Sequence, residues 1–100
     1  MITQIHYKKG DLKVWWIPQV PMKAFTVNVK SIREAKLLLD TLGQYDLFQF
    51  QHRIKPDYSN AGGLNVYSPE DADETGNCWV TWYNDDGSDI DEVDEDGKTV

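Results

Sequence analysis

The sequence holds few of the residues that small proteins use for covalent links, metal sites or catalysis. Its single cysteine, Cys78, among 100 residues excludes an internal disulfide framework and a four-cysteine zinc site. Its two histidines, His6 and His52, show no metal-ligand spacing, and no nucleophile motif lies beside them. We therefore predict a fold held by hydrophobic packing in a reducing compartment, with no cofactor, no metal and no enzymatic activity.

Long apolar runs are also missing. No segment approaches the roughly 18 apolar residues of a membrane span, and Met1 to His6 lack the basic and then apolar pattern of a signal peptide. A chain of 100 residues, 40% of them apolar, is too short for two cores of typical size. We expect one domain in the cytoplasm, with no membrane partner.

Charge is distributed unevenly along the chain. The net charge of −7 combines +4 over residues 1–67, where nine basic residues face five acidic ones, with −11 over residues 68–100. In the second part, twelve acidic residues face only Lys98. The overall charge disfavours nucleic acid as a partner, whereas the basic sign of the first part leaves a small anionic ligand open.

Residues 86–100 form the acidic end of the chain and have only Ile90, Val93 and Val100 as apolar content. So little apolar surface cannot offset the entropy lost when the chain is ordered. We therefore predict an α+β domain over residues 1–85 and an acidic, mobile C-terminal tail over residues 86–100. Such a tail solvates the protein, mimics nucleic acid toward a basic partner, or folds back on the basic first part.

Alternating apolar residues predict the strands. Residues 12–17 place Val14 and Trp16 on one face and Trp15 on the other, so both faces are expected to be covered. Residues 25–29 alternate as a half-buried strand, with Phe25, Val27 and Val29 on one face. Short strands are also expected at 3–7, 64–67 and 78–83, the last two as an antiparallel hairpin.

A helix is predicted from Ile32 to Leu42. Ser31 and Glu34 have the spacing of a capping box, apolar residues then recur with the helical period, and Gly43 ends the pattern. Residues 46–51 fit either a second short helix or a strand. The predicted fold class is α+β: a single compact domain with a mainly antiparallel sheet of four or five strands and one main helix packed on it.

Two features provide candidate binding residues. A loop expected at 55–63 gathers five hydrogen-bonding side chains beside a glycine pair: Lys55, Asp57, Tyr58, Ser59 and Asn60. It lacks the Gly-Lys-Ser ending of a phosphate-binding Walker loop, so a tight turn is the alternative. Four tryptophans exceed what a small core requires, and Trp15 and Trp79 are the candidates for partner contacts. Cys78 is expected to be a buried small residue.

Four stretches carry a resemblance to a known family: VWWIPQVPMKAF at 14–25, EAKLLLDTL at 34–42, YDLFQF at 45–50 and KPDYSNAGGL at 55–64. Over about residues 12–91 the chain resembles a family of small phage proteins that is labelled superinfection-exclusion proteins. The resemblance implies a phage or prophage origin and activity in the host cytoplasm. It brings no catalytic residues.

These observations predict a non-enzymatic phage accessory protein that interferes with a competing phage or a host process by binding a host or phage protein. We expect the binding surface to join Trp15, the loop from Lys55 to Asn60, and the last strand with Trp79. The first alternative is a small-molecule or nucleotide-binding protein that sequesters a host immune signal. The second is a nucleic-acid mimic that acts through the acidic tail.

Overall fold

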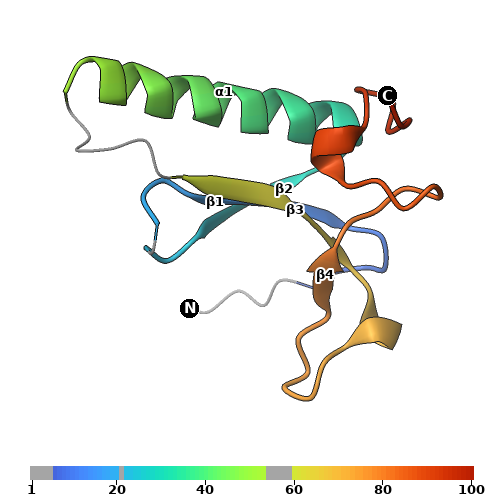
Figure 1. Cartoon of the computed structure of the whole chain (residues 1–100). Helices are drawn as coiled ribbons and strands as arrows, with labels where there is room; N and C mark the ends of the chain where they lie inside the picture. The colour runs from blue at the N-terminus through green and yellow to red at the C-terminus, as the bar shows by residue number, and fades with distance from the viewer. Residues whose placement is uncertain (1–5, 21, 54–59) are drawn as a thin grey trace.

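The protein folds as a helix packed on a four-stranded sheet, in a computed structural model that describes residues 6–20, 22–53 and 60–100 (Figure 1). The elements are β1 (Leu12–Ile17), β2 (Phe25–Val29), α1 (Ile32–Gln51), β3 (Ala61–Tyr67) and β4 (Trp79–Thr81). The strand order is β2-β1-β3-β4, and every neighbouring pair is antiparallel. The predicted α+β class, with an antiparallel sheet and one packed helix, is confirmed.

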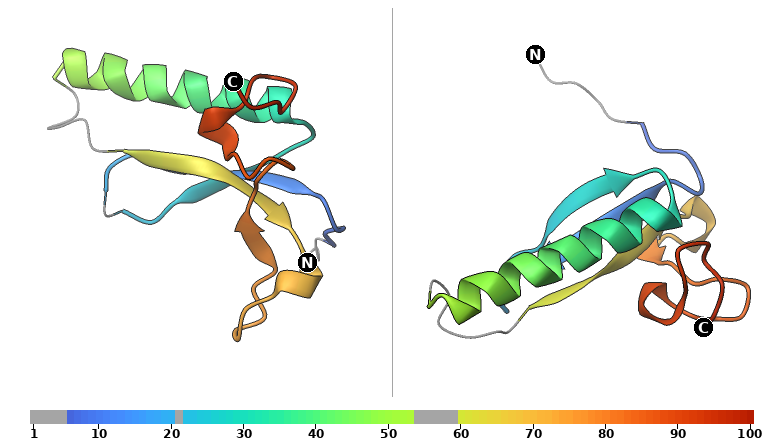
Figure 2. Two further views of the ribbon diagram at one scale, coloured as in Figure 1. Left: turned by 45° about the vertical axis from the view of Figure 1, so that its right-hand side comes forward. Right: turned by 90° about the horizontal axis from the view of Figure 1, so that it is seen from above.

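Side-chain alternation divides the sheet into a covered face and an open face. Val14 of β1 pairs with Leu64 of β3, and the next pair along is Trp15 with Gly63. Val14 and Leu64 are almost completely buried, so their side of the sheet lies under α1. Seen from above, α1 lies over the sheet along the direction of β1 and β3 (Figure 2). The opposite side carries Trp15 and is called the open face below.

The core lies between α1 and the covered face, and its buried residues come from β1, β3, α1 and the C-terminal segment. They are Val14, Leu64, Ala35, Ile90 and Val93. Strand β2 adds little to this core, because it is the edge strand farthest from β3 and Phe25 and Val27 are 44% and 36% exposed. Phe25 and Val27 pair with Trp16 and Val14 and so share the covered face, in agreement with the predicted alternation, but the strand is more exposed than the half-buried strand predicted.

Helix α1 continues to Gln51 instead of ending at Leu42, so residues 46–51 are its last turns. It starts as predicted, because the Ser31 hydroxyl accepts a hydrogen bond from the Glu34 N–H at 3.1 Å. Gly43 does not end it, since a glycine within a helix costs only about 1 kcal/mol relative to alanine. A Cβ at Gly43 would lie 3.9 Å from the Trp16 ring, so the helix passes close to the sheet at this point.

Strand β3 begins at Ala61, so the glycine pair expected in a loop belongs to the sheet. The two tryptophans of β1 explain this placement. A Cβ at Gly62 would overlap the Trp16 ring on the covered face, and a Cβ at Gly63 would lie 2.8 Å from Trp15 Nε1 on the open face. Each glycine therefore provides the space into which a neighbouring indole packs.

Two further predictions differ from the structure at the ends of the sheet. Strand β4 covers Trp79–Thr81 only, and Cys78 precedes it as a half-buried rather than a buried residue. The strand expected at residues 3–7 lies mostly outside the described residues, and Tyr7 belongs to no strand. Strands β3 and β4 form the expected antiparallel hairpin, in which Asn65 pairs with Thr81.

The acidic C-terminal segment packs on the core, so the predicted mobile tail over residues 86–100 is not confirmed. Its two central apolar side chains, Ile90 and Val93, are only 3% and 2% exposed. A 3₁₀ helix, η2 (Ile90–Glu92), presents Ile90 to the sheet and helix, and Asp89 and Glu92 close it with a capping box. Few apolar residues suffice here because two of the three, Ile90 and Val93, pack into the core.

The acidic side chains of this segment stabilise its own turns. The Asp94 carboxylate accepts hydrogen bonds from the N–H groups of Lys98 at 3.0 Å and Asp96 at 2.9 Å. These two backbone donors hold the pKa of Asp94 below its usual value. Arg33 of α1 joins the segment to the helix through Glu95 at 2.7 Å and Asp96 at 3.3 Å.

The two glycines of β3 give a paired test of the contacts with the tryptophans. Gly62→Ala should lower the free energy of unfolding by about 1–3 kcal/mol, because the new Cβ meets a buried ring. Gly63→Ala should cost less, because the half-buried Trp15 can move away from the added methyl group. Urea denaturation of both variants measures the difference, and equal losses would contradict this account of the strand.

A second pair of substitutions tests the packing of the C-terminal segment. Ile90→Ala should lower the free energy of unfolding by about 2–4 kcal/mol, the usual cost of emptying a buried aliphatic site. Val100→Ala is the control, since Val100 is 86% exposed and its loss should leave stability unchanged. Thermal and urea denaturation report both. If Ile90→Ala were as stable as the wild type, the prediction of a mobile C-terminal tail would be supported instead.

Candidate functional site

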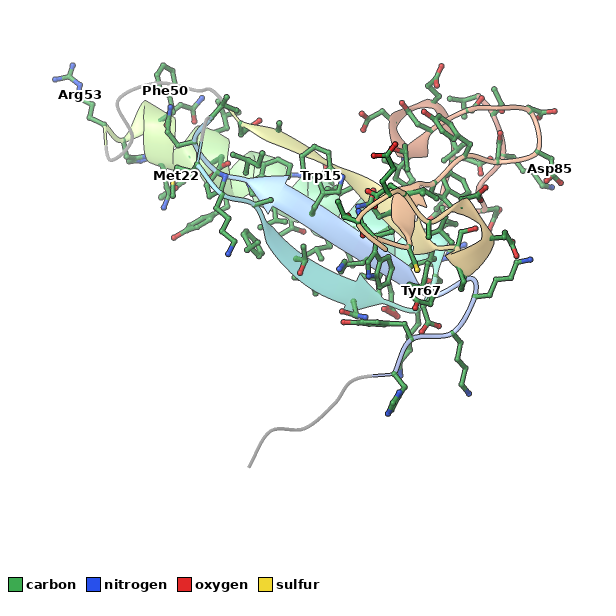
Figure 3. The ribbon with its side chains drawn as sticks, turned by 90° about the horizontal axis from the view of Figure 1, so that it is seen from below. Trp15, Met22, Phe50, Arg53, Tyr67 and Asp85 are labelled. Atoms are coloured by element: carbon green, nitrogen blue, oxygen red, sulfur yellow. The ribbon has the colours of Figure 1, made fainter. Side chains whose placement is uncertain are left out.

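Among the described residues no α-helix lies on the open face of the sheet, and this face carries a row of large aromatic side chains. Figure 3, seen from below, shows Trp15 and Tyr67 on this side. Trp15 comes from β1, Tyr67 from the end of β3 and Trp79 from the start of β4, opposite Tyr67. The alternation of three adjacent strands therefore brings residues that are far apart in the sequence to one surface.

Three rings pack together at the β4 end of the open face, and they are called the aromatic cluster below. The ring of Tyr7 lies edge-on to Trp79, with centroids 4.8 Å apart and planes at 81°. Tyr67 meets Trp79 at 5.2 Å and 60°, and Tyr7 meets Tyr67 at 5.6 Å. Edge-to-face pairs of this kind each add about 0.5–1.5 kcal/mol beyond their burial. The cluster is therefore formed within the folded chain itself.

Lys13 of β1 places a positive charge on the aromatic cluster. Its Nζ lies 4.1 Å from the centroid of the Trp79 ring and 5.8 Å from that of Tyr7. Partial burial among these rings lowers the pKa of the Lys13 ammonium from its ordinary value. The tyrosine beneath is also perturbed, since a hydrogen bond with the Cys78 thiol raises the pKa of Tyr67. A partner that covers the aromatic cluster would contact packed rings around the single charge of Lys13.

This arrangement suits binding. Tyrosine and tryptophan are the residues that most often dominate the energy of protein interfaces, since they bury a large area at little cost in conformational entropy. A lysine held over a ring can offer its charge to a carboxylate of the partner while the aromatic faces are desolvated. The part of the chain that the structure describes has no group of three or more His, Cys, Asp or Glu side chains that could hold a metal ion.

The structure brings only some of the predicted site residues together. Trp15 and Trp79 share the open face, with the Lys13–Asn65 pair between them. Asn60 lies apart from them, because its Nδ2 donates a hydrogen bond to Asp46 Oδ2 of α1 at 3.2 Å. The other four predicted loop residues lie outside the described residues: Lys55, Asp57, Tyr58 and Ser59. Their part in binding stays a prediction.

Sequence reasoning missed three residues of this surface: Tyr7, Lys13 and Tyr67. For Lys13 and Tyr67 the alternation of their strands was a sufficient signal, because each is two positions from a residue of the open face. Tyr7 had no such signal, because it lies outside the strands and reaches the cluster only through the fold.

Among the described residues, α1 is the one long helix, and it does not have the length and apolar character needed to cross a membrane. Polar and charged residues recur along it, and Asp46 is buried against the sheet with its carboxylate bonded to Trp16 Nε1 at 3.0 Å. The helix is built to pack on the sheet.

Comparison with known proteins gives two matches and one negative result. Residues 11–99 match the model of a family described as superinfection exclusion gene product 17. The chain is also similar to a superinfection exclusion protein of Salmonella phage P22, with 45% identity over 78 residues, which cover 72% of this chain and 76% of that protein. No solved structure matches the chain significantly. The resemblance found in the sequence is confirmed.

The hydrogen bond from Asn60 to Asp46 predicts that Asn60 stabilises the fold. Asn60→Ala should lower the free energy of unfolding by about 1–3 kcal/mol, because a buried carboxylate loses a donor. Asn28→Ala on the exposed strand β2 is the control and should stay within about 0.5 kcal/mol of wild type. Urea denaturation measures both. If the two variants are equally stable, the hydrogen bond to Asp46 adds nothing and Asn60 is free to serve a partner.

Proposed function

The chain belongs to the superinfection exclusion gene product 17 family, and we propose that it excludes superinfecting phage by binding a macromolecular partner through its open face. The partner is a protein of the host or of the competing phage, met in the host cytoplasm. On this proposal the protein is a binding protein and not an enzyme. The observation that supports it best is the aromatic cluster with Lys13 above it.

Charge favours a protein over a nucleic acid as the partner. The whole chain carries a net charge of −7, which opposes approach to a phosphate backbone. Lys13 is a single cation within the aromatic cluster, too little for tracking phosphates but enough to pair with one carboxylate. Rings that are already packed lose little side-chain entropy on binding, so their burial against a partner is converted into affinity.

Reversing the charge of Lys13 tests the proposal without touching the core. Lys13→Glu places a carboxylate against the ring faces and should weaken exclusion by about tenfold, the loss expected when one interface residue of moderate importance is removed. Lys23→Glu makes the same charge change at an exposed site before β2 that has no contact with the aromatic cluster, and should leave exclusion intact. Plating of superinfecting phages on cells that express each variant measures the effect.

Two measurements separate loss of binding from loss of folding. Both variants should keep the thermal transition of the wild type within a few degrees, and both should accumulate to equal levels in the cell. Full exclusion by a folded Lys13→Glu variant would overturn the role of the open face. Equal loss in both variants would show that the overall charge is what matters.

A further inference from the structure

Strand β3 is longer than its neighbour β4, so part of its edge has no strand beside it. Six of the seven residues of β3, Ala61 to Val66, pair with β1 on one side, but on the other side only Asn65, Val66 and Tyr67 pair with β4. Among the described residues, the last backbone hydrogen bond on that side runs from the Trp82 N–H to the Leu64 carbonyl, at 3.0 Å. Beyond it the chain turns away from the sheet.

Alternation shows which backbone groups point to this bare edge. The Tyr67 N–H bonds to the Asp11 carbonyl on the β1 side at 2.8 Å, whereas Leu64 meets Trp82 on the opposite side. Because hydrogen-bonding direction alternates along an antiparallel strand, Gly63 bonds toward β1 and Gly62 points outward. The N–H and carbonyl of Gly62 therefore lie at the edge, and no other described residue pairs with them.

A hollow lies on each side of Gly62. The larger one, about 1020 Å³, lies on the covered side and is lined by Trp16, the helix residues Lys36 and Asp40, and Ile90 of the C-terminal segment. The smaller one, about 110 Å³, is bounded by the indole of Trp15. An extended chain directs successive side chains to opposite faces, so these hollows stand where a strand beside Gly62 would place its side chains.

The charged residues around the two hollows are acidic on balance, with two cations, Arg33 and Lys36, against the four carboxylates of Asp40, Asp89, Asp91 and Glu95. Arg33 is engaged by Glu95 at 2.7 Å, and the Nζ of Lys36 donates to the Ile90 carbonyl at 2.9 Å. The carboxylates at the rims belong to residues of α1 and of the C-terminal segment: Asp40, Asp89 and Asp91. The surroundings of the free backbone groups therefore favour cationic side chains in an incoming segment.

We propose that the edge of β3 at Gly62 binds an extended, basic segment of a partner polypeptide as an added strand. The two backbone groups of Gly62 provide the hydrogen bonds, as in other proteins that bind peptides by strand addition. The large hollow takes a long apolar or basic side chain, and the small hollow beside Trp15 takes a small one. This peptide site differs from the aromatic cluster, and its test does not depend on the proposed function.

Hydrogen exchange at the two glycines provides a test with an internal control. The probes are short peptides in which lysine alternates with valine, leucine or phenylalanine, added to the full chain labelled with ¹⁵N. Binding should slow exchange of the Gly62 amide by about tenfold, because an open N–H becomes bonded. Exchange at the Gly63 amide should not change, since it already bonds to β1. Peptides N-methylated on their pairing amides keep their side chains and should fail to bind.

A pair of variants tests whether the acidic residues beside the large hollow contribute to peptide binding. Asp40→Lys changes the charge at the large hollow and should weaken binding of the lysine peptides by about fivefold. Asp85→Lys makes the same change at an exposed residue outside both hollows and should bind as wild type does. Isothermal titration calorimetry measures both affinities, and the chemical shifts of the core amides confirm that each variant is folded.

Several results would overturn the proposal. The first is binding of none of the peptides at millimolar concentration. The second is binding that leaves Gly62 exchange unchanged, which would place the peptides elsewhere. Equal affinity of the N-methylated peptides would show that side chains alone are recognised. Protection of Gly62 that grows with protein concentration in the absence of peptide would show that a second copy of the chain occupies the edge.

Discussion

The hydrogen bond between the Trp16 indole and Asp46 holds the two layers of the fold together. Trp16 comes from β1 and Asp46 from the last turns of α1, and both side chains are almost fully buried, so water does not compete for the bond. The same ring fills the space that a side chain at Gly62 would need, and it lies under Gly43. One indole thereby contacts both the helix and the neighbouring strand. It requires glycine at position 62, whereas a Cβ at Gly43 would make only ordinary van der Waals contact with it.

The uneven charge of the sequence is balanced within the fold. The acidic C-terminal segment returns to the basic face of α1, where Arg33 and Lys36 meet its carboxylates and a carbonyl. Ion pairs as exposed as these contribute about 0–1 kcal/mol each. The burial of Ile90 and Val93 is the larger contribution, and the charges decide where on the molecule the segment lies.

The sequence predicted the features that depend on local patterns and missed those that depend on one distant residue. Alternation in β1 and the Ser31 cap were sufficient for the strand, the helix start and the fold class. Gly43 and the glycine pair were interpreted as breaks, although Gly43 lies within α1 and the pair lies within β3. Only the tertiary packing explains the pair, because Trp16 lies against Gly62 and Trp15 against Gly63. A mobile tail was predicted from the small number of apolar residues in 86–100, whereas the positions of Ile90 and Val93 decide whether the segment packs on the core. That Trp15 and Trp79 share a face follows from the register of β1, β3 and β4, which alternation within one strand does not give.

The packing of the C-terminal segment also explains why β3 has a bare edge. For Ile90 to reach the core, the chain must leave the sheet soon after Thr81, and it does so at the turn that joins the Asn84 N–H to the Ser88 carbonyl. Because β4 is short, the first residues of β3 have no strand beside them on that side. Proteins commonly protect such edges with charged side chains, and here acidic residues of the same segment stand beside Gly62. The packing of Ile90 into the core thus leaves an unpaired edge of β3 at Gly62, with acidic side chains beside it.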